Sequence, residues 1–133
     1  GSTMDARLRE MAILQVGWLA RSPYEWSHHV KIGFDFGVSK DDIRKLIAET
    51  DGEDTDLAAI DKTVLRAARE ITLDGKVSSK TFAVLEAHFS KEHLIDLLVT
   101  MAFYNAVVRF LASTEMDVEE SYQPYLEQFP LPK

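Results

Sequence analysis

The chain has 133 residues, no cysteine, 46% hydrophobic residues and a formal net charge of −7. Its length suits one domain, and its acidic balance without a basic stripe argues against a nucleic-acid partner. The absence of thiols excludes disulfides, thiolate metal sites and cysteine nucleophiles. Polar residues interrupt the longest apolar stretches, so we expect none to be long enough to cross a bilayer and no membrane partner. No secretory signal pattern is seen at the start of the sequence, so we expect a cytoplasmic location.

Hydrophobic periodicity predicts about six helices and no strand, and therefore an all-α, bundle-like domain over residues 1–133. The first helix is expected over about 5–21 and is apolar on nearly every face from Met11 to Ala20. A helix of that kind is buried all round, which in so small a domain suggests burial against another subunit.

The second helix has a clear start signal. Ser22 suits the N-cap, Pro23 suits the first helical position, and Glu25 completes the pattern of a capping box, in which its carboxylate returns to the N–H of Ser22. Gly37 ends the helix.

Three further helices are expected within about 39–48, 57–74 and 78–89, with an acidic linker over 49–56. The sixth runs from about 91 to 113 and is again apolar on most faces, which adds to the expectation of a homo-oligomer. The tail, residues 115–133, holds three of the four prolines between aromatic residues, and we expect it to pack on the domain or on a neighbouring subunit.

The candidate chemistry centres on the second helix. Glu25 and His29 are four residues apart and share a helix face, where a carboxylate can orient an imidazole and raise its pKa. If the first two helices are antiparallel around Ser22, Glu10 comes level with His29. A histidine with a carboxylate on each side suits general acid–base catalysis.

Structural interpretations compete with this one. Glu25 is explained by the cap, Glu10 by a surface pair with a neighbouring arginine, and His29 by a satisfied structural position. His28 points elsewhere and is interpreted as a surface or interface residue, and Trp26 as packing.

Other chemistries fit the pattern less well. The spacing of Glu25, His28 and His29 does not reproduce a metal motif such as His-Glu-x-x-His, so we expect no metal and no other cofactor. A nucleophilic pair of Ser22 and His29 is disfavoured, because a capping hydroxyl is engaged with the backbone and no nucleophile elbow surrounds it. A metal-assisted hydrolase remains a third alternative that elemental analysis would test.

Residues 8–14 followed by residues 22–29 resemble the carboxymuconolactone decarboxylase family, which also contains the alkylhydroperoxidase D-like proteins. The peroxidase branch of that family has a Glu, then Cys-x-x-Cys, then a His. Here Glu10 and His29 match the Glu and the His, while Ser22 and Glu25 occupy the two cysteine positions. The resemblance covers residues 5–111 and includes Tyr104, within a segment where the family often has an aromatic–Asn pair.

The resemblance implies an all-α, alkylhydroperoxidase D-like helical bundle that forms trimers or hexamers. Without both thiols the peroxidase and disulfide-reductase activities are excluded, so the decarboxylase branch fits better. On that reading His29 is the general acid that delivers a proton after carbon dioxide leaves, with Glu10 or Glu25 orienting it. The resemblance also implies a set of substrate-binding residues: Arg9, Ser22, Tyr24, Trp26 and Tyr104.

Two hypotheses therefore stand side by side. The first is a cofactor-free, decarboxylase-like lyase that acts on a small carboxylated lactone or related acid. The second is a non-catalytic small-molecule-binding or structural oligomer of the same fold. The first expects a concave pocket beside Glu10, Glu25 and His29, and the second expects His29 to be sealed by core side chains.

Overall fold

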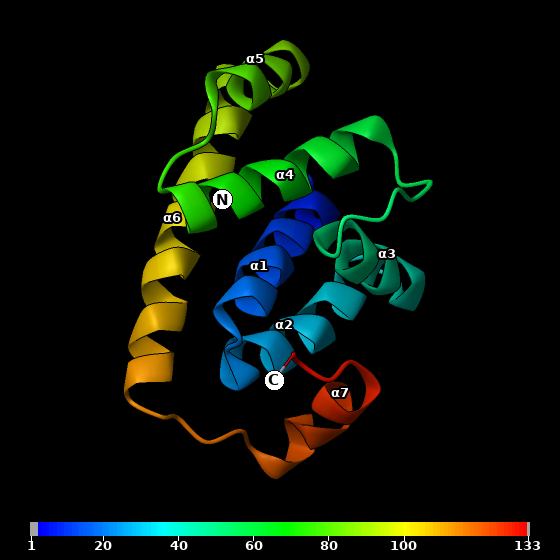
Figure 1. Ribbon diagram of the computed structural model, residues 1–133, viewed down its shortest axis with the longest axis vertical. Helices are drawn as coiled ribbons and strands as arrows, with labels where there is room; N and C mark the ends of the chain where they lie inside the picture. The colour runs from blue at the N-terminus through cyan, green and yellow to red at the C-terminus, as the bar shows by residue number, and fades with distance from the viewer. Residues whose placement is uncertain (1–2, 133) are drawn as a thin grey trace.

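The computed structural model describes residues 3–132, and within that range it contains helices and no strand (Figure 1). The all-α expectation is confirmed. The elements are α1 (Ala6–Ala20), α2 (Pro23–Asp35), α3 (Lys40–Thr50), α4 (Ala59–Asp74), α5 (Ser79–His88), α6 (Lys91–Ser113), the 3₁₀ helix η1 (Glu120–Tyr122) and α7 (Gln123–Gln128).

The first helix, α1, is the central element of the domain (Figure 1). It packs against α2, α4 and α6 and also contacts α3. This arrangement buries almost every side chain from Leu8 to Trp18 within one chain. The apolar surface of α1 therefore needs no second subunit, and the interpretation that linked it to an oligomer is wrong for this helix.

The two sides of α1 belong to two hydrophobic clusters. Leu8, Ala12 and Val16 pack with side chains of α4, α5 and α6. Met11, Leu14 and Trp18 pack with side chains of α2 and α3 and with Phe129 of the tail. Because one helix joins both clusters, it fixes where α2 and α6 lie relative to each other.

A tight turn joins α1 to α2. Arg21 adopts a left-handed conformation with φ of 53°, which lets the N–H groups of Arg21 and Ser22 bond to carbonyl oxygens in the last turn of α1. Farther along the pair, a Cβ added at Gly33 would lie 3.5 Å from Leu14 and 3.3 Å from Val38. The small residue therefore keeps the two helices close, and Glu10 lies opposite His29.

Arg7 ties the start of α1 to two neighbouring helices. Its guanidinium donates two hydrogen bonds to Asp42 of α3 and two to Asp61 of α4, at 2.9–3.1 Å. These hydrogen bonds hold the pKa of the arginine above its usual range. Of the two arginines that could pair with Glu10, Arg7 is thus committed to other carboxylates.

The tail lies on the outer side of α2 (Figure 1). The indole Nε1 of Trp26 donates a hydrogen bond of 2.8 Å to the carbonyl oxygen of Phe129, and the Phe129 side chain is buried. Tyr122 stacks on His28 at a ring distance of 3.8 Å, and Tyr125 contacts Phe34. The tail thus packs on its own domain through aromatic contacts.

The last long helix, α6, is only partly covered. It is the one helix within residues 3–132 that is long and apolar enough to cross a membrane, and 28% of that stretch is buried. The expectation that no apolar stretch is long enough to cross a bilayer is therefore wrong, because the polar residues within α6 are too few to interrupt its apolar stretch.

Candidate acid–base site between α1, α2 and α6

The structure brings Glu10, Glu25 and His29 together in the interior. His29 Nδ1 donates a hydrogen bond of 2.9 Å to Oε1 of Glu10, and its Nε2 lies 3.0 Å from Oε2 of Glu25. All three residues are at least 93% buried. The predicted histidine between two carboxylates is therefore present, and both ring nitrogens face a carboxylate oxygen.

The role of Glu25 differs from a capping box. The Ser22 hydroxyl accepts the Glu25 N–H at 3.4 Å, but the N–H of Ser22 donates to the carbonyl oxygen of Gly17. The carboxylate of Glu25 thus has no cap donor to accept and turns to His29, one helical turn later. A complete capping box occurs instead at Ser39 and Asp42 of α3.

The two carboxylates decide the charge of His29. Burial alone lowers the pKa of an imidazole, but the hydrogen bond to Glu10 and the contact with Glu25 outweigh it and raise the pKa of His29 from 6.5 to about 9. The ring is therefore an imidazolium near neutral pH. When both carboxyl groups are ionised, the cluster carries one net negative charge.

Each carboxylate also has an oxygen with unused hydrogen-bonding capacity. Oε2 of Glu10 is buried and accepts no hydrogen bond from the described residues. Oε2 of Glu25 lies within ion-pair distance of His29 but without the alignment of a hydrogen bond. A buried oxygen of this kind is costly unless a ligand or water donates a hydrogen bond to it.

Tyr104, on α6, covers the ring of His29. Its ring meets the edge of the His29 ring at 5.0 Å, and the phenol is half-buried. Burial and the nearby carboxylates of Glu25 and Glu10 raise the pKa of Tyr104, so its hydroxyl remains a proton donor.

A pocket of about 190 Å³ reaches this cluster through Glu10. Its other lining residues are Met4, Ala6, Arg9 and Phe36. Arg9 is exposed and lies close enough to Tyr104 to oppose the rise in its pKa. The pocket thus combines the carboxyl group of Glu10, the cationic side chain of Arg9 and apolar walls. Glu10 is the one lining residue of this pocket that contacts His29.

The remaining predicted residues lie elsewhere. Trp26 is in the core and bonded to the tail, and Ser22 is buried at the helix cap. Tyr24 stacks on His28 at 4.1 Å rather than on His29, and His28 Nδ1 donates to the carbonyl oxygen of Tyr24. Of the eight candidates, the structure therefore places Arg9 and Glu10 on the pocket, while His29, Glu25 and Tyr104 are grouped with Glu10 in the buried cluster.

Sequence reasoning missed Met4 and Phe36, which form apolar walls of the pocket. Met4 precedes the first helix, and Phe36, which the pattern placed in the second helix, lies at its C-cap, so neither was recognised as part of a pocket. Only the antiparallel path of α1 and α2 could have indicated that both ends meet beside Glu10.

The acidic residues do not form a ligand set for a metal. Among residues 3–132 no group of three or more His, Asp or Glu side chains is arranged to hold an ion.

The model of the carboxymuconolactone decarboxylase family matches residues 1–70, a little more than half of the chain. That match includes α1, α2 and α3 and hence Glu10, Glu25 and His29. No curated protein and no solved structure matches the chain. The matched residues and the helical fold lead to one conclusion: the chain belongs to the carboxymuconolactone decarboxylase family.

Proposed function

We propose that this protein is a cofactor-free enzyme that transfers a proton at carbon, as a decarboxylase-like lyase acting on a small carboxylated lactone or related acid. The observation that carries the proposal is the imidazolium of His29 held between two buried carboxylates. Perturbed acids and bases of this kind gather at catalytic sites. The family match supports the fold and adds to the case for this class of reaction.

In the proposed reaction the bond between the substrate's carboxyl carbon and its α-carbon breaks and carbon dioxide leaves. The electron pair enters an enolate that the lactone carbonyl stabilises. His29 passes its Nδ1 proton to Glu10, and Glu10 delivers a proton to the carbanion carbon from the pocket side. His29 then regains a proton from solvent, so that one proton is consumed for each carbon dioxide released.

This assignment changes the direct proton donor from His29 to Glu10. Both nitrogens of His29 are engaged by carboxylates, whereas Glu10 lines the pocket and has a free buried oxygen. Glu25 stabilises the imidazolium from the other side. Arg9 supplies the positive charge that an anionic substrate needs beside an acidic cluster.

The second candidate is a non-catalytic member that binds a small molecule or serves a structural role. The specific observation in its favour is that the pocket beside Glu10 does not include His29 among its lining residues. In that case the unpaired Oε2 of Glu10 binds a donor group of a ligand and no bond is broken.

Carbon dioxide release from a panel of carboxylated lactones and β-keto acids tests the proposal. We expect turnover by the wild type and a loss of about 10²–10⁴-fold in both Glu10→Gln and His29→Ala, as for removal of a general acid. His88→Ala, which changes an exposed histidine at the end of α5, is the matched control and keeps full activity. An active His29→Ala variant contradicts the mechanism, and a panel without any turnover favours the binding alternative.

A further inference from the structure

The pocket beside Glu10 offers a ligand two opposite charges. The Glu10 carboxylate is 3% exposed, and its Oε1 accepts the hydrogen bond of His29, whereas its Oε2 accepts none from the described residues. Arg9 lines the same pocket, is exposed, and has no ion pair with a carboxylate among residues 3–132. A buried acceptor and an unpaired cation thus lie on consecutive residues of α1, at one pocket.

These two charges distinguish between kinds of ligand. With His29 protonated and both carboxyl groups ionised, the buried cluster has one net negative charge, and Arg9 adds a separate positive charge. A simple anion complements Arg9 but is repelled by Glu10, unless Glu10 has taken the proton of His29 as in the proposed reaction. A simple cation complements Glu10 but is repelled by Arg9. A zwitterion complements both groups at once and brings no net charge to the pocket.

The rest of the pocket lining has no charge. It consists of Met4, Ala6 and Phe36, and Phe36 is 55% exposed, so an apolar part of a ligand would remove its surface from water. The volume of about 190 Å³ is below the roughly 300–1,000 Å³ of pockets that hold drug-sized ligands, so the ligand is small. Because Arg9 and Glu10 are adjacent in the chain, we expect the ligand to have both charges at one end and an apolar group at the other.

We propose that this pocket binds a small α-amino acid with an apolar side chain, whose carboxylate pairs with Arg9 and whose ammonium group donates to Oε2 of Glu10. An α-amino acid has both charged groups on one carbon and leaves the rest of the molecule apolar. The proposal uses the pocket of the proposed reaction but not the reaction itself. An amino acid bound here excludes the substrate and keeps Glu10 ionised, so it also inhibits any proton transfer through Glu10.

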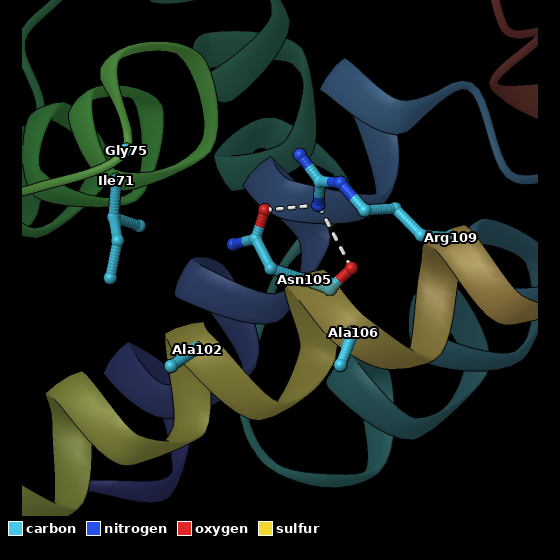
Figure 2. Close-up of a pocket in the computed structure, with 6 residues that line it drawn as sticks. All are labelled: Ile71, Gly75, Ala102, Asn105, Ala106 and Arg109. Atoms are coloured by element: carbon cyan, nitrogen blue, oxygen red, sulfur yellow. Dashed lines mark hydrogen bonds between the residues drawn. The ribbon is translucent and has the colours of Figure 1, made fainter.

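A second pocket that contains an arginine lacks this combination. Figure 2 shows Arg109 folded back onto Asn105 of α6, where its guanidinium donates to the side-chain and backbone oxygens of the asparagine. The hollow around them, of about 310 Å³, has no carboxylate among its lining residues. It offers a positive group and apolar walls but no acceptor with a charge for an ammonium group. Arg109 is therefore the matched control for Arg9.

Titration calorimetry of the wild type with L-leucine tests the class of ligand. We expect L-leucine to bind at least about tenfold more tightly than isocaproate, which lacks the amino group, and than isoamylamine, which lacks the carboxylate. The compound ε-aminocaproate has both charges at opposite ends of its chain and should bind as weakly as these two. An absence of L-leucine binding at millimolar concentration overturns the proposal, and so does any of the three analogues that binds as tightly as L-leucine.

Substitutions test the two assigned partners of the ligand. Glu10→Gln removes the negative charge that the ammonium group meets, and Arg9→Met removes the guanidinium but keeps an apolar stem. Each should weaken L-leucine binding at least about tenfold, whereas Arg109→Met should bind as the wild type does. Circular dichroism confirms that the variants fold, and Arg9→Met changes an exposed residue. An Arg9→Met variant that binds L-leucine as tightly as the wild type or as Arg109→Met overturns the proposal.

The ring of His29 gives an independent readout of where the amino acid binds. The hydrogen bond to Glu10 is one of the causes that raise the pKa of His29. An ammonium group on Oε2 of Glu10 offsets the negative charge that the ring faces, so bound L-leucine should lower the pKa of His29, whereas isocaproate should not. NMR titration of the ring resonances with and without ligand measures this. An unchanged titration of His29 with L-leucine bound overturns the assignment to this pocket.

Failure of the amino-acid site can be told apart from failure of the proposed reaction. A wild type that releases carbon dioxide but does not bind L-leucine refutes the amino-acid site alone. Binding of L-leucine without turnover of any carboxylated compound supports the amino-acid site and counts against the reaction. Where both occur, L-leucine should raise KM for the acid and leave kcat unchanged, because the two compounds share one pocket. Turnover that saturating L-leucine does not slow overturns the amino-acid site.

Discussion

Raising the pH should weaken the fold through His29. The folded chain raises the pKa of this histidine to about 9, whereas an unfolded chain has the ordinary value of 6.5. Between these values the folded state holds a proton that the unfolded state has released, so stability falls as pH rises. The contribution is fully present below pH 6.5 and is lost as the pH passes through 9. At about 1.4 kcal/mol for each tenfold change in the equilibrium, it amounts to about 3 kcal/mol.

Urea unfolding at pH 6 and pH 9 measures this contribution. We expect the free energy of unfolding of the wild type to drop by about 3 kcal/mol more than that of His29→Gln, which has no proton to lose at this position. His88→Gln should behave as the wild type, because His88 is exposed. The comparison within each variant cancels the overall cost of the substitution.

The cause of the pKa shift is tested by Glu10→Gln. The substitution keeps the size of the side chain but removes the charge that His29 Nδ1 faces at 2.9 Å, so the pKa of His29 should fall towards its ordinary value. Titration of the imidazole resonances by NMR reads this directly. A His29 resonance that titrates near pH 6.5 in the wild type would refute the reasoning, whatever the urea data show.

Three further substitutions test local contacts. Ser22→Ala should cost about 0.5–1 kcal/mol in urea unfolding, because the hydroxyl caps α2 by a single long bond of 3.4 Å. Trp26→Phe removes the donor to the Phe129 carbonyl and should cost about 1–2 kcal/mol, with faster proteolysis of the tail as a second readout. Arg7→Met should cost about 2 kcal/mol in urea unfolding, because the ion pair of Arg7 with Asp42 is partly exposed. Burial raises the pKa of Asp42, but Arg7 holds that pKa below its usual range, so the substitution should raise it. An unchanged Asp42 titration by NMR would contradict this account of the ion pair.

The sequence predicts the pairing of Glu10 with His29, because both lie at similar distances from one turn between antiparallel helices. It does not decide the role of Glu25, because a local cap and a histidine one turn away compete for the same carboxylate. The tertiary fold decides it by giving the Ser22 N–H to Gly17. Pattern rules see neighbours along the chain, so they name both possible partners of Glu25 without choosing between them.

The two apolar helices show the same limit. Both α1 and α6 are apolar on most faces, and periodicity assigns both to contact with another subunit. In the structure α1 is the central helix and is covered by its own chain, whereas α6 lies at the edge and keeps an open face. The tail likewise has no periodic pattern, yet the Phe129 carbonyl meets Trp26 across 103 residues. Which apolar helix face stays exposed depends on how the helices are arranged in the fold, and the hydrophobic pattern of the sequence does not specify that arrangement.

Ser22 and Glu25 occupy the positions where the resemblance to the peroxidase branch places two cysteines, and their chemistry there differs from that of thiols. Ser22 is buried and its hydroxyl caps α2, so of these two residues only Glu25 contacts His29. A second carboxylate on His29 favours the imidazolium more strongly than Glu10 alone would, and it leaves the cluster with a net negative charge when both acids are ionised. Such a cluster favours any event that brings a proton donor or a cation to the unpaired oxygen of Glu10. Glu10 also lines the pocket beside Arg9, so ligand binding and proton transfer are expected to meet there.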